Sequence, residues 1–207
     1  DAAQMLGGDV VVSSDQPTPA AFVERAQALG LSAIQTQTFP TMARTTPEKG
    51  EAGRLVMLKA VSAGYPLRGT LGVTRAGAMP TSGQAAASGA VRQQGAGASA
   101  LQPEQAVTAG PGRGEIWPEP AVLDTLGLQI GDELMLGESR LRITAVLTRE
   151  PDRGNNFINF APRAMMALED LPATQLVQPA SRVNYRLALV GPAGAVRHPF
   201  ATPPGPG

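Results

Sequence analysis

The pattern of hydrophobic and polar residues predicts a chain built mainly of strands, with a few short helices. The segment 9–14 (DVVVSS) is rich in β-branched residues and is typical of a buried strand. Thr18 and Pro19 are typical of the start of a helix, and Gly30 is typical of its end. A further strand is expected at 32–38, so the chain opens with a β-α-β unit.

Three strands in the middle of the chain are predicted from two contrasting patterns. The segment 54–61 (RLVMLKAV) is apolar on both faces, which predicts a central strand in a sheet that is covered on both sides. The segment 141–147 alternates apolar and polar residues, as half-buried antiparallel strands do. It is expected to form a hairpin with a strand inside 128–137.

Four further elements complete the regular structure that the pattern predicts. A short strand is expected at 69–74, and a short helix is expected to begin at Pro120 and to end at Gly127. The segment 161–168 is predicted to be helical. A last strand is predicted at 182–190, where alternate residues are apolar.

The segment 76–114 differs from the rest because Gly, Ala, Ser, Gln, Pro and Thr dominate it. Such a composition buries too little apolar surface to offset an ordering cost of about 1–2 kcal/mol per residue. We therefore predict a flexible low-complexity insertion, with a short helix at 102–107. The Pro- and Gly-rich tail at 192–207 is predicted to be frayed.

Composition and charge exclude several classes of function. The chain has 207 residues, and its 17 basic and 17 acidic side chains leave no electrostatic footprint for nucleic acid. Cysteine is absent, which excludes disulfides and thiolate chemistry. No stretch approaches the roughly 18 apolar residues of a transmembrane helix. No cofactor motif or metal-ligand spacing is found, and a chain that begins at Asp1 looks like an excised domain.

Two motifs resemble catalytic or phosphate-binding loops. Ser62 lies between a predicted strand and Gly64, as in a nucleophile elbow, but the only histidine is His198 in the tail. A turn residue is the favoured interpretation, and a catalytic serine is the weaker one. The segment 110–114 (GPGRG) follows no predicted strand, and Pro111 removes an amide donor, so phosphate binding is disfavoured.

The densest charge cluster consists of Arg149, Glu150, Asp152 and Arg153. Paired carboxylates can act as acid and base when their environments separate their pKa values. Here each acid has an adjacent arginine and Pro151 stiffens the loop, so we favour a salt-bridged or partner-contacting loop.

The notable aromatic residues beyond the first helix could line a groove for an apolar ligand, but core packing is their usual role. They are Trp117, Phe157, Phe160 and Tyr185.

Three motifs in this order resemble one family of membrane proteins. The first is the run Tyr65, Pro66, Leu67, Arg68, Gly69; the second is Gly127 with Gly131 and Asp132; the third runs from Glu150 to Pro162 and Arg163. Together they resemble the extracytoplasmic domain of MacB/FtsX-type ABC transporter permeases, most closely the YbbP-like branch. The long 76–114 insertion departs from the family pattern.

The resemblance implies an α+β fold in two halves. A porter-like half would be formed by 1–75 and 176–191, and a smaller β-rich, sabre-like half by 115–175. The insertion at 76–114 and the tail at 192–207 would lie outside both halves.

The resemblance also implies a function without catalysis in this chain. Such a domain is periplasmic, lies between two transmembrane helices of an inner-membrane permease, and needs no cofactor. Its expected partners are a cytoplasmic ABC ATPase, a second permease copy and a periplasmic esterase or acyl hydrolase, and its substrates would be lipids or other hydrophobic compounds. The alternative is a stand-alone periplasmic hydrolase or a lipid- or sugar-binding domain. Close approach of the chain at Leu6 and at Gly191 would favour the permease, and wide separation would contradict it.

Overall fold

A computed structural model describes residues 2–6, 9–77, 101–152 and 161–191. The strands are β1 Ala2–Leu6, β2 Asp9–Ser14, β3 Ser32–Arg44, β4 Gly53–Val61, β5 Leu71–Thr74, β6 Gln105–Val107, β7 Glu115–Pro118, β8 Glu133–Leu136, β9 Ser139–Ile143, β10 Val146–Arg149, β11 Arg163–Ala167 and β12 Asn184–Val190. The helices are α1 Ala20–Ala28, α2 Pro120–Leu126 and α3 Leu171–Thr174, with 3-10 turns η1 Pro47–Lys49 and η2 Leu168–Asp170.

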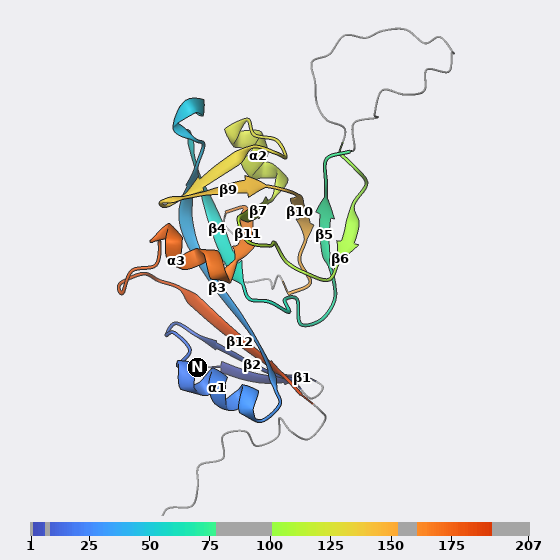
Figure 1. Cartoon of the computed structure of the whole chain (residues 1–207), viewed down its shortest axis with the longest axis vertical. Helices are drawn as coiled ribbons and strands as arrows, with labels where there is room; N and C mark the ends of the chain where they lie inside the picture. The colour runs from blue at the N-terminus through green and yellow to red at the C-terminus, as the bar shows by residue number, and fades with distance from the viewer. Residues whose placement is uncertain (1, 7–8, 78–100, 153–160, 192–207) are drawn as a thin grey trace, which may run out of the picture.

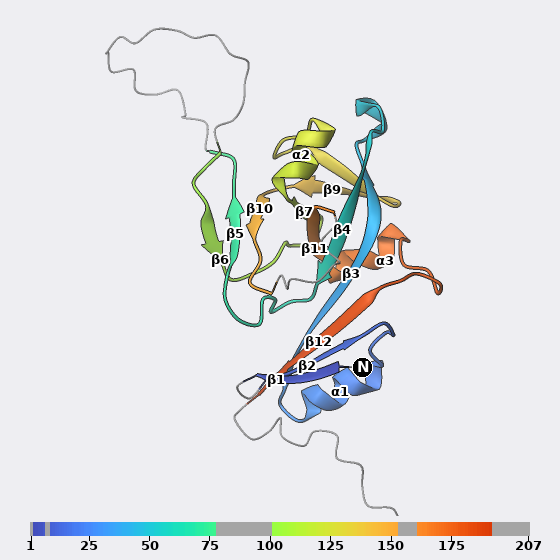
Figure 2. The same ribbon diagram turned by 180° about the vertical axis from the view of Figure 1, so that it is seen from behind.

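Nine of these strands form one mixed sheet that closes on itself at one end. Its order is β1-β2-β12-β3-β4-β11-β7-β9-β8, and β8 pairs again with β3. The strands β3, β4, β11, β7, β9 and β8 therefore form a barrel, while β1, β2 and β12 extend from β3 as an open sheet. Figures 1 and 2 show the barrel at the upper end and this open sheet, with α1, at the lower end.

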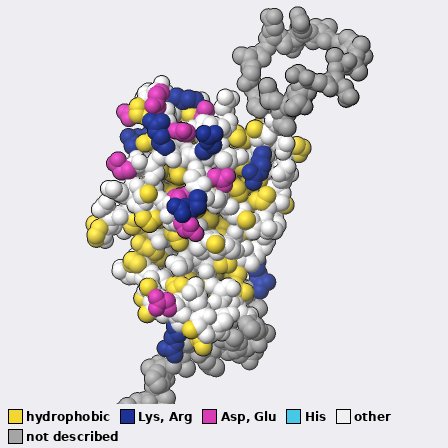
Figure 3. Space-filling model, in the orientation of Figure 1, with side chains coloured by type: hydrophobic (Ala, Val, Ile, Leu, Met, Phe, Trp, Pro, Cys, Tyr) yellow, Lys and Arg dark blue, Asp and Glu magenta, His cyan; other side chains and the backbone are white. Residues whose placement is uncertain are grey.

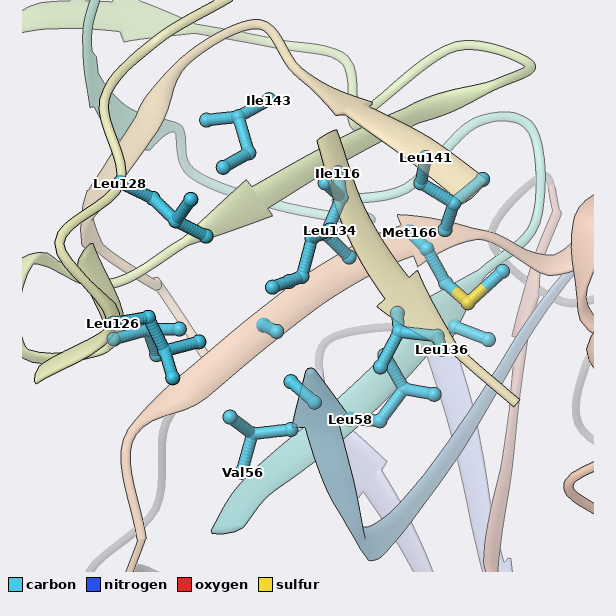
Figure 4. Packing of buried hydrophobic residues seen from close by; sticks show 14 of the residues in the cluster. Val56, Leu58, Ile116, Leu126, Leu128, Leu134, Leu136, Leu141, Ile143 and Met166 are labelled. Atoms are coloured by element: carbon cyan, nitrogen blue, oxygen red, sulfur yellow. The ribbon is translucent and has the colours of Figure 1, made fainter. Parts of the chain in front are cut away.

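The barrel interior holds the largest apolar cluster of the described residues. Alternate residues of β4, namely Val56, Leu58 and Ala60, point into it and are fully buried. They meet side chains from the other barrel strands and from α2, which point toward one another in Figure 4. Filling of a small barrel by side chains is expected, because its interior is only wide enough for them.

A second cluster lies between the outer face of the barrel and the three-stranded sheet β10-β5-β6. Leu71, Val73 and Leu147 come from that sheet, and Trp117 and Met165 come from the barrel. The barrel strands β4, β7 and β11 are thus covered on both faces. The prediction that 54–61 is a central, doubly covered strand is confirmed by β4.

The open sheet carries the third cluster, where α1 covers β12 and β3. Ala26 of α1 and Leu187 and Leu189 of β12 are buried together there. Since β12 lies between β2 and β3 and is antiparallel to both, β2, α1 and β3 form a β-α-β unit split by the last strand. This confirms the predicted β-α-β start and the predicted last strand.

The predicted helix at 161–168 is wrong. Residues Arg163–Ala167 form β11, which pairs parallel with β4 and antiparallel with β7, and all five residues are buried. A short apolar run such as RAMMA is compatible with a buried helix or a buried strand, and its length of five suits a strand. Tertiary pairing therefore determined the conformation.

The predicted single strand at 141–147 is also wrong in part. It is divided into β9, which pairs with β8 as the expected hairpin, and β10, which belongs to the other sheet. The chain changes sheets at Thr144 and Ala145. Ala145, Val146 and Leu147 are all buried there, although alternation would leave Val146 exposed.

The predicted helix at 102–107 is replaced by strand β6, which pairs with β5. Residues 101–114 of the predicted insertion are thus described, whereas 78–100 and the tail at 192–207 lie outside the described residues. The fold is mixed α+β and consists mostly of strands, as predicted. The division into porter-like and sabre-like halves stays a prediction, and β4 and β11, from the two predicted halves, pair directly.

Candidate functional site

The clearest cluster of charged groups in the described residues surrounds Lys59, on the outer face of β4. Lys59 is only 4 % exposed, and Met57 and Val61 on the same face are buried. Its Nζ atom lies 2.9 Å from both carboxylate oxygens of Asp152 and 3.2 Å from Oε2 of Glu150. A buried ammonium needs such partners, because an unpaired charge inside a protein is costly.

Glu150 connects Lys59 to Arg163 of β11. Its side chain is 1 % exposed, and its Oε1 accepts a hydrogen bond of 2.8 Å from Nε of Arg163. The backbone N–H of Arg163 donates to Oε1 of Glu119 at 2.7 Å. One buried carboxylate therefore binds side chains from two adjacent barrel strands and holds the segment after β10 against them.

Tyr65 and Asp152 complete this ion-pair network. The Tyr65 hydroxyl donates to Oδ1 of Asp152 at 2.5 Å and accepts a bond of 2.8 Å from Nζ of Lys59. Burial and the neighbouring Asp152 charge raise the pKa of Tyr65, so the hydroxyl stays a donor. Burial also acts to raise the pKa of Asp152, but Lys59 and the Tyr65 hydroxyl outweigh it and lower that pKa below 3.8.

A turn after β4 places Tyr65 beside Lys59. Gly64 and Gly69 both have positive φ, at 88° and 76°. A Cβ atom at Gly69 would lie 2.9 Å from Cβ of Pro151, which is closer than such atoms approach. Gly69 therefore allows the turn to lie directly against Pro151, between the two acids of the network.

A pocket of about 140 Å³ lies beside the network. Its walls are the turn at 65–68 and the residues at 151–152. Its floor is formed by two strands, β3 and β12, each of which contributes two residues that are two positions apart. They are Ile34, Thr36, Arg186 and Ala188. Four of the five residues of the first family motif, all but Gly69, thus line one pocket.

The structure divides the predicted contact loop. Arg149 is half exposed and contacts Glu104 and Thr70, so its contact role stays a prediction, and Arg153 lies outside the described residues. Glu150 is buried and takes its cations from Lys59 and Arg163 instead of the adjacent arginines. The salt-bridged interpretation therefore holds for Glu150, with cations other than the expected ones, and a partner contact of this loop stays a prediction.

Asp152 is likewise paired with residues that are distant in the sequence. Its cations are Lys59, at 2.9 Å, and Arg186, at 3.6 Å. Lys59 was not predicted as a site residue, although a single lysine inside the apolar run RLVMLKAV was a usable signal. A lysine at a buried strand position requires an acid nearby.

The second family motif lies far from the network along the chain, in the turns before β8. Gly127 has positive φ and ends α2. Asp132 accepts a hydrogen bond from the Gln129 N–H at 2.9 Å and pairs with Lys49 at 3.0 Å. Gly131 also has positive φ, at 98°. These residues shape the rim of the barrel, and Pro162 of the third motif accepts a bond from the Met57 N–H.

The two motifs with a catalytic or phosphate-binding resemblance lie together. Residues 62–65 and 109–113 line a second pocket of about 300 Å³. The Ser62 hydroxyl accepts a hydrogen bond from the Gln35 N–H at 2.8 Å, and His198 lies outside the described residues. The N–H groups of Gly112 and Gly114 already donate to carboxylates, at 2.6 Å each. A free phosphate cradle is therefore not formed there.

The predicted core role of the aromatics holds for two of them. Trp117 is buried and donates to the Thr144 hydroxyl at 2.9 Å, and Tyr185 packs against the barrel cluster. Phe157 and Phe160 lie outside the described residues. Among the described residues no group of three His, Asp or Glu could hold a metal ion.

Exposed charges are unevenly distributed over the face shown in Figure 3. Figure 3 shows acidic and basic side chains interspersed at the upper end of the molecule, and hydrophobic side chains over its middle. The exposed ion pairs among the described residues include those of Arg140 with Glu48 and Glu133. Within the described segments, no helix is long and apolar enough to cross a membrane.

Comparison with known proteins finds a related permease. The chain is 30 % identical over 188 residues to a protein described as an uncharacterized ABC transporter permease YbbP of Escherichia coli (strain K12). The alignment covers 91 % of this chain and 19 % of that protein, so the chain spans only a small part of the permease's length. No protein-family model and no solved structure matches. The similarity supports a domain related to ABC transporter permeases.

Proposed function

We propose that this chain is an extracytoplasmic domain of an ABC transporter permease, which couples ATP hydrolysis by a partner to conformational change outside the membrane. The similarity to the Escherichia coli permease over 91 % of the chain carries the proposal. The ATPase activity would reside in a separate cytoplasmic subunit. A second permease copy would be a further partner.

The positions of the two ends of the domain agree with this role. Met5 of β1 and Leu189 of β12 are both paired with Val10 of β2, so Leu6 and Gly191 lie at the same end of the strands of the open sheet. Because β2 lies between β1 and β12, these two strands are two strand spacings, or roughly 10 Å, apart. Ala2, at the other end of β1, lies in the same open sheet (Figure 1). Two membrane helices could attach at this end of the molecule.

The long strand β3 offers a mechanical connection. Its residues 32–38 pair with β12 in the open sheet, and its residues 36–44 pair with β4 in the barrel. The barrel has no free edge between β3 and β8 and is filled by a closely packed core. A displacement of the open sheet would therefore move the barrel as a unit.

Membrane context is tested by cysteine labelling in the full-length permease. The 207 residues contain no cysteine, so Leu55→Cys, at an exposed position near the start of β4, adds one defined thiol. In intact cells of a strain whose permease lacks other cysteines, we expect a membrane-impermeant maleimide to label Leu55→Cys. The matched control, Leu58→Cys in the barrel interior, should be labelled only after denaturation. Labelling of Leu55→Cys only in lysed cells would contradict the proposal.

Coupling is tested in the same protein reconstituted with its ATPase. The rate of labelling at several exposed positions should differ between the nucleotide-free and ATP-bound complexes. Equal rates at every position would leave the membrane assignment standing and refute the coupling.

The second candidate is a stand-alone periplasmic hydrolase or a lipid- or sugar-binding domain. The observation in its favour is the pair of pockets that flank Tyr65. Esterase activity that persists unchanged in Ser62→Ala would eliminate Ser62 as the nucleophile. Activity abolished by that substitution, in a chain that stays folded, would instead favour the hydrolase.

A further inference from the structure

The floor of the 140 Å³ pocket is set by the register of two strands. β12 and β3 pair so that Arg186 lies opposite Thr36 and Ala188 lies opposite Ile34. Alternate residues of a strand point to the same face, so these four side chains share one surface. They give the pocket an apolar half, from Ile34 and Ala188, and a polar half, from Thr36 and Arg186.

Arg186 has donors available toward the pocket. Within the described residues its ion-pair partner is Asp152, with 3.6 Å between Nη1 and Oδ2. That distance exceeds the 2.7–3.2 Å typical of N–H···O hydrogen bonds. Asp152 is already held at 2.9 Å by Lys59 and at 2.5 Å by Tyr65. The guanidinium, with five N–H groups, is therefore only partly satisfied by its partner.

Thr36 adds a polar group to the pocket floor. The residue is 6 % exposed and lines the pocket. Its hydroxyl is not one of the fully buried polar atoms that lack a hydrogen-bond partner, so among the described residues it is a group that the pocket can reach. A ligand oxygen beside Arg186 would be near this hydroxyl, because the two residues are directly opposite in the strand pairing.

Charge and size then limit the ligand. Among the charged residues that line the pocket, Arg186 contacts Asp152 only at 3.6 Å, and the Asp152 carboxylate is held more closely by Lys59. A cavity of about 150 Å³ can hold a benzene-sized molecule. The pocket therefore suits an anionic group joined to an apolar part of about six carbon atoms.

We propose that this pocket binds a small amphiphilic anion, a carboxylate or phosphate on a short apolar chain, with Arg186 and Thr36 holding the anionic group and Ile34, Ala188 and Leu67 contacting the chain. This site is independent of the proposed transport role. It would exist equally in a stand-alone protein, so either proposal can fail without the other.

The test is an NMR titration of the 207-residue chain with four probes of matched length. Hexanoate and hexyl phosphate carry the anion, and hexanol and hexylammonium are controls without it. We expect one or both anions to bind with a Kd on the order of 1 mM and to shift signals of the pocket residues. The stronger anion identifies the head group. If hexanol or hexylammonium bound as tightly as the anions, the role of the anionic group would be overturned. If neither anion bound at a concentration about 20-fold above the expected Kd, the site itself would be overturned.

Substitutions assign the contacts. Arg186→Gln should weaken binding of the anion by about tenfold, because it removes a charge-assisted contact. Thr36→Val should weaken it about threefold by removing one hydroxyl. Arg182→Gln makes the same change of charge at an exposed residue of the segment before β12 and should leave the Kd unchanged. Unaltered affinity in both Arg186→Gln and Thr36→Val would refute the proposed contacts.

Discussion

The two faces of β4 are both buried, but they are stabilised by different interactions. On the inner face, Val56, Leu58 and Ala60 pack in the apolar barrel. On the outer face, Lys59 lies between Met57 and Val61 and takes part in the ion-pair network. Apolar burial requires only the right volume, whereas a buried charge requires partners in fixed positions.

This difference separates the roles of the two faces. The inner face stabilises the barrel through contacts that many apolar residues could make. The outer face connects β4, β11, the turn at 65–69 and the segment 150–152 through specific hydrogen bonds. The network thus determines where the turn and the segment lie, and with them the walls of the 140 Å³ pocket.

The largest expected effect is on the outer face. Glu150→Gln removes the carboxylate charge that Lys59 and Arg163 share, and breaking a buried ion pair costs about 3–5 kcal/mol. We expect that loss in the free energy of unfolding, measured by urea denaturation at pH 7. The control Glu138→Gln makes the same change at an exposed side chain and should alter stability by less than about 0.5 kcal/mol. Equal effects of the two substitutions would show that the network contributes no specific stability.

A somewhat smaller effect is expected on the inner face. Leu58→Ala leaves a cavity in the barrel and should lower the free energy of unfolding by about 3 kcal/mol. Leu55→Ala is the matched control, because Leu55 lies on the same strand but is 40 % exposed. Leu58→Ala should also leave the pocket walls in place, as read from the NMR signals of 65–68. If it displaced those signals as strongly as Glu150→Gln does, the two faces would not be separable.

The smallest effect concerns the pH dependence that only the outer face should show. The folded pKa of Asp152 lies below 3.8, so its contribution to stability is present above that pH and is lost as the pH falls toward the folded pKa. The stability difference between the parent and Asp152→Asn should therefore be constant from about pH 7 to pH 5 and should shrink below about pH 4. Urea denaturation across this range measures it. Asp124→Asn, exposed on α2, is the control, and a difference that grows on acidification would contradict the assignment.

Most strands and two of the helices could be predicted from the sequence, because their patterns are local. The β-branched run at 9–14, the doubly apolar run at 54–61 and the helix before Gly127 all appear in the structure. The segment 163–167 could not be assigned in this way. Five apolar residues fit a buried helix or strand equally, and the position between β4 and β7 decided it.

The candidate site was predicted only in part. The sequence identified Tyr65 to Arg68 and the acids Glu150 and Asp152 as informative, but it paired those acids with their neighbours Arg149 and Arg153. Their observed cations are 91 or more positions away at Lys59, or lie on β11 and β12 at Arg163 and Arg186. Ion pairs across a sheet depend on strand order, which local patterns do not reveal.

The sequence by itself therefore determined most of the strands, much of the apolar core, and that no nucleic-acid, thiol or recognisable cofactor chemistry is expected. Only the tertiary structure decided that β3 closes the barrel with β8, that Lys59 is neutralised by Glu150 and Asp152, and that Thr36 and Arg186 share a pocket floor. The reason is physical. Burial and local conformation depend on neighbours a few residues apart, whereas pairing and charge compensation depend on residues that meet only after the sheet has formed.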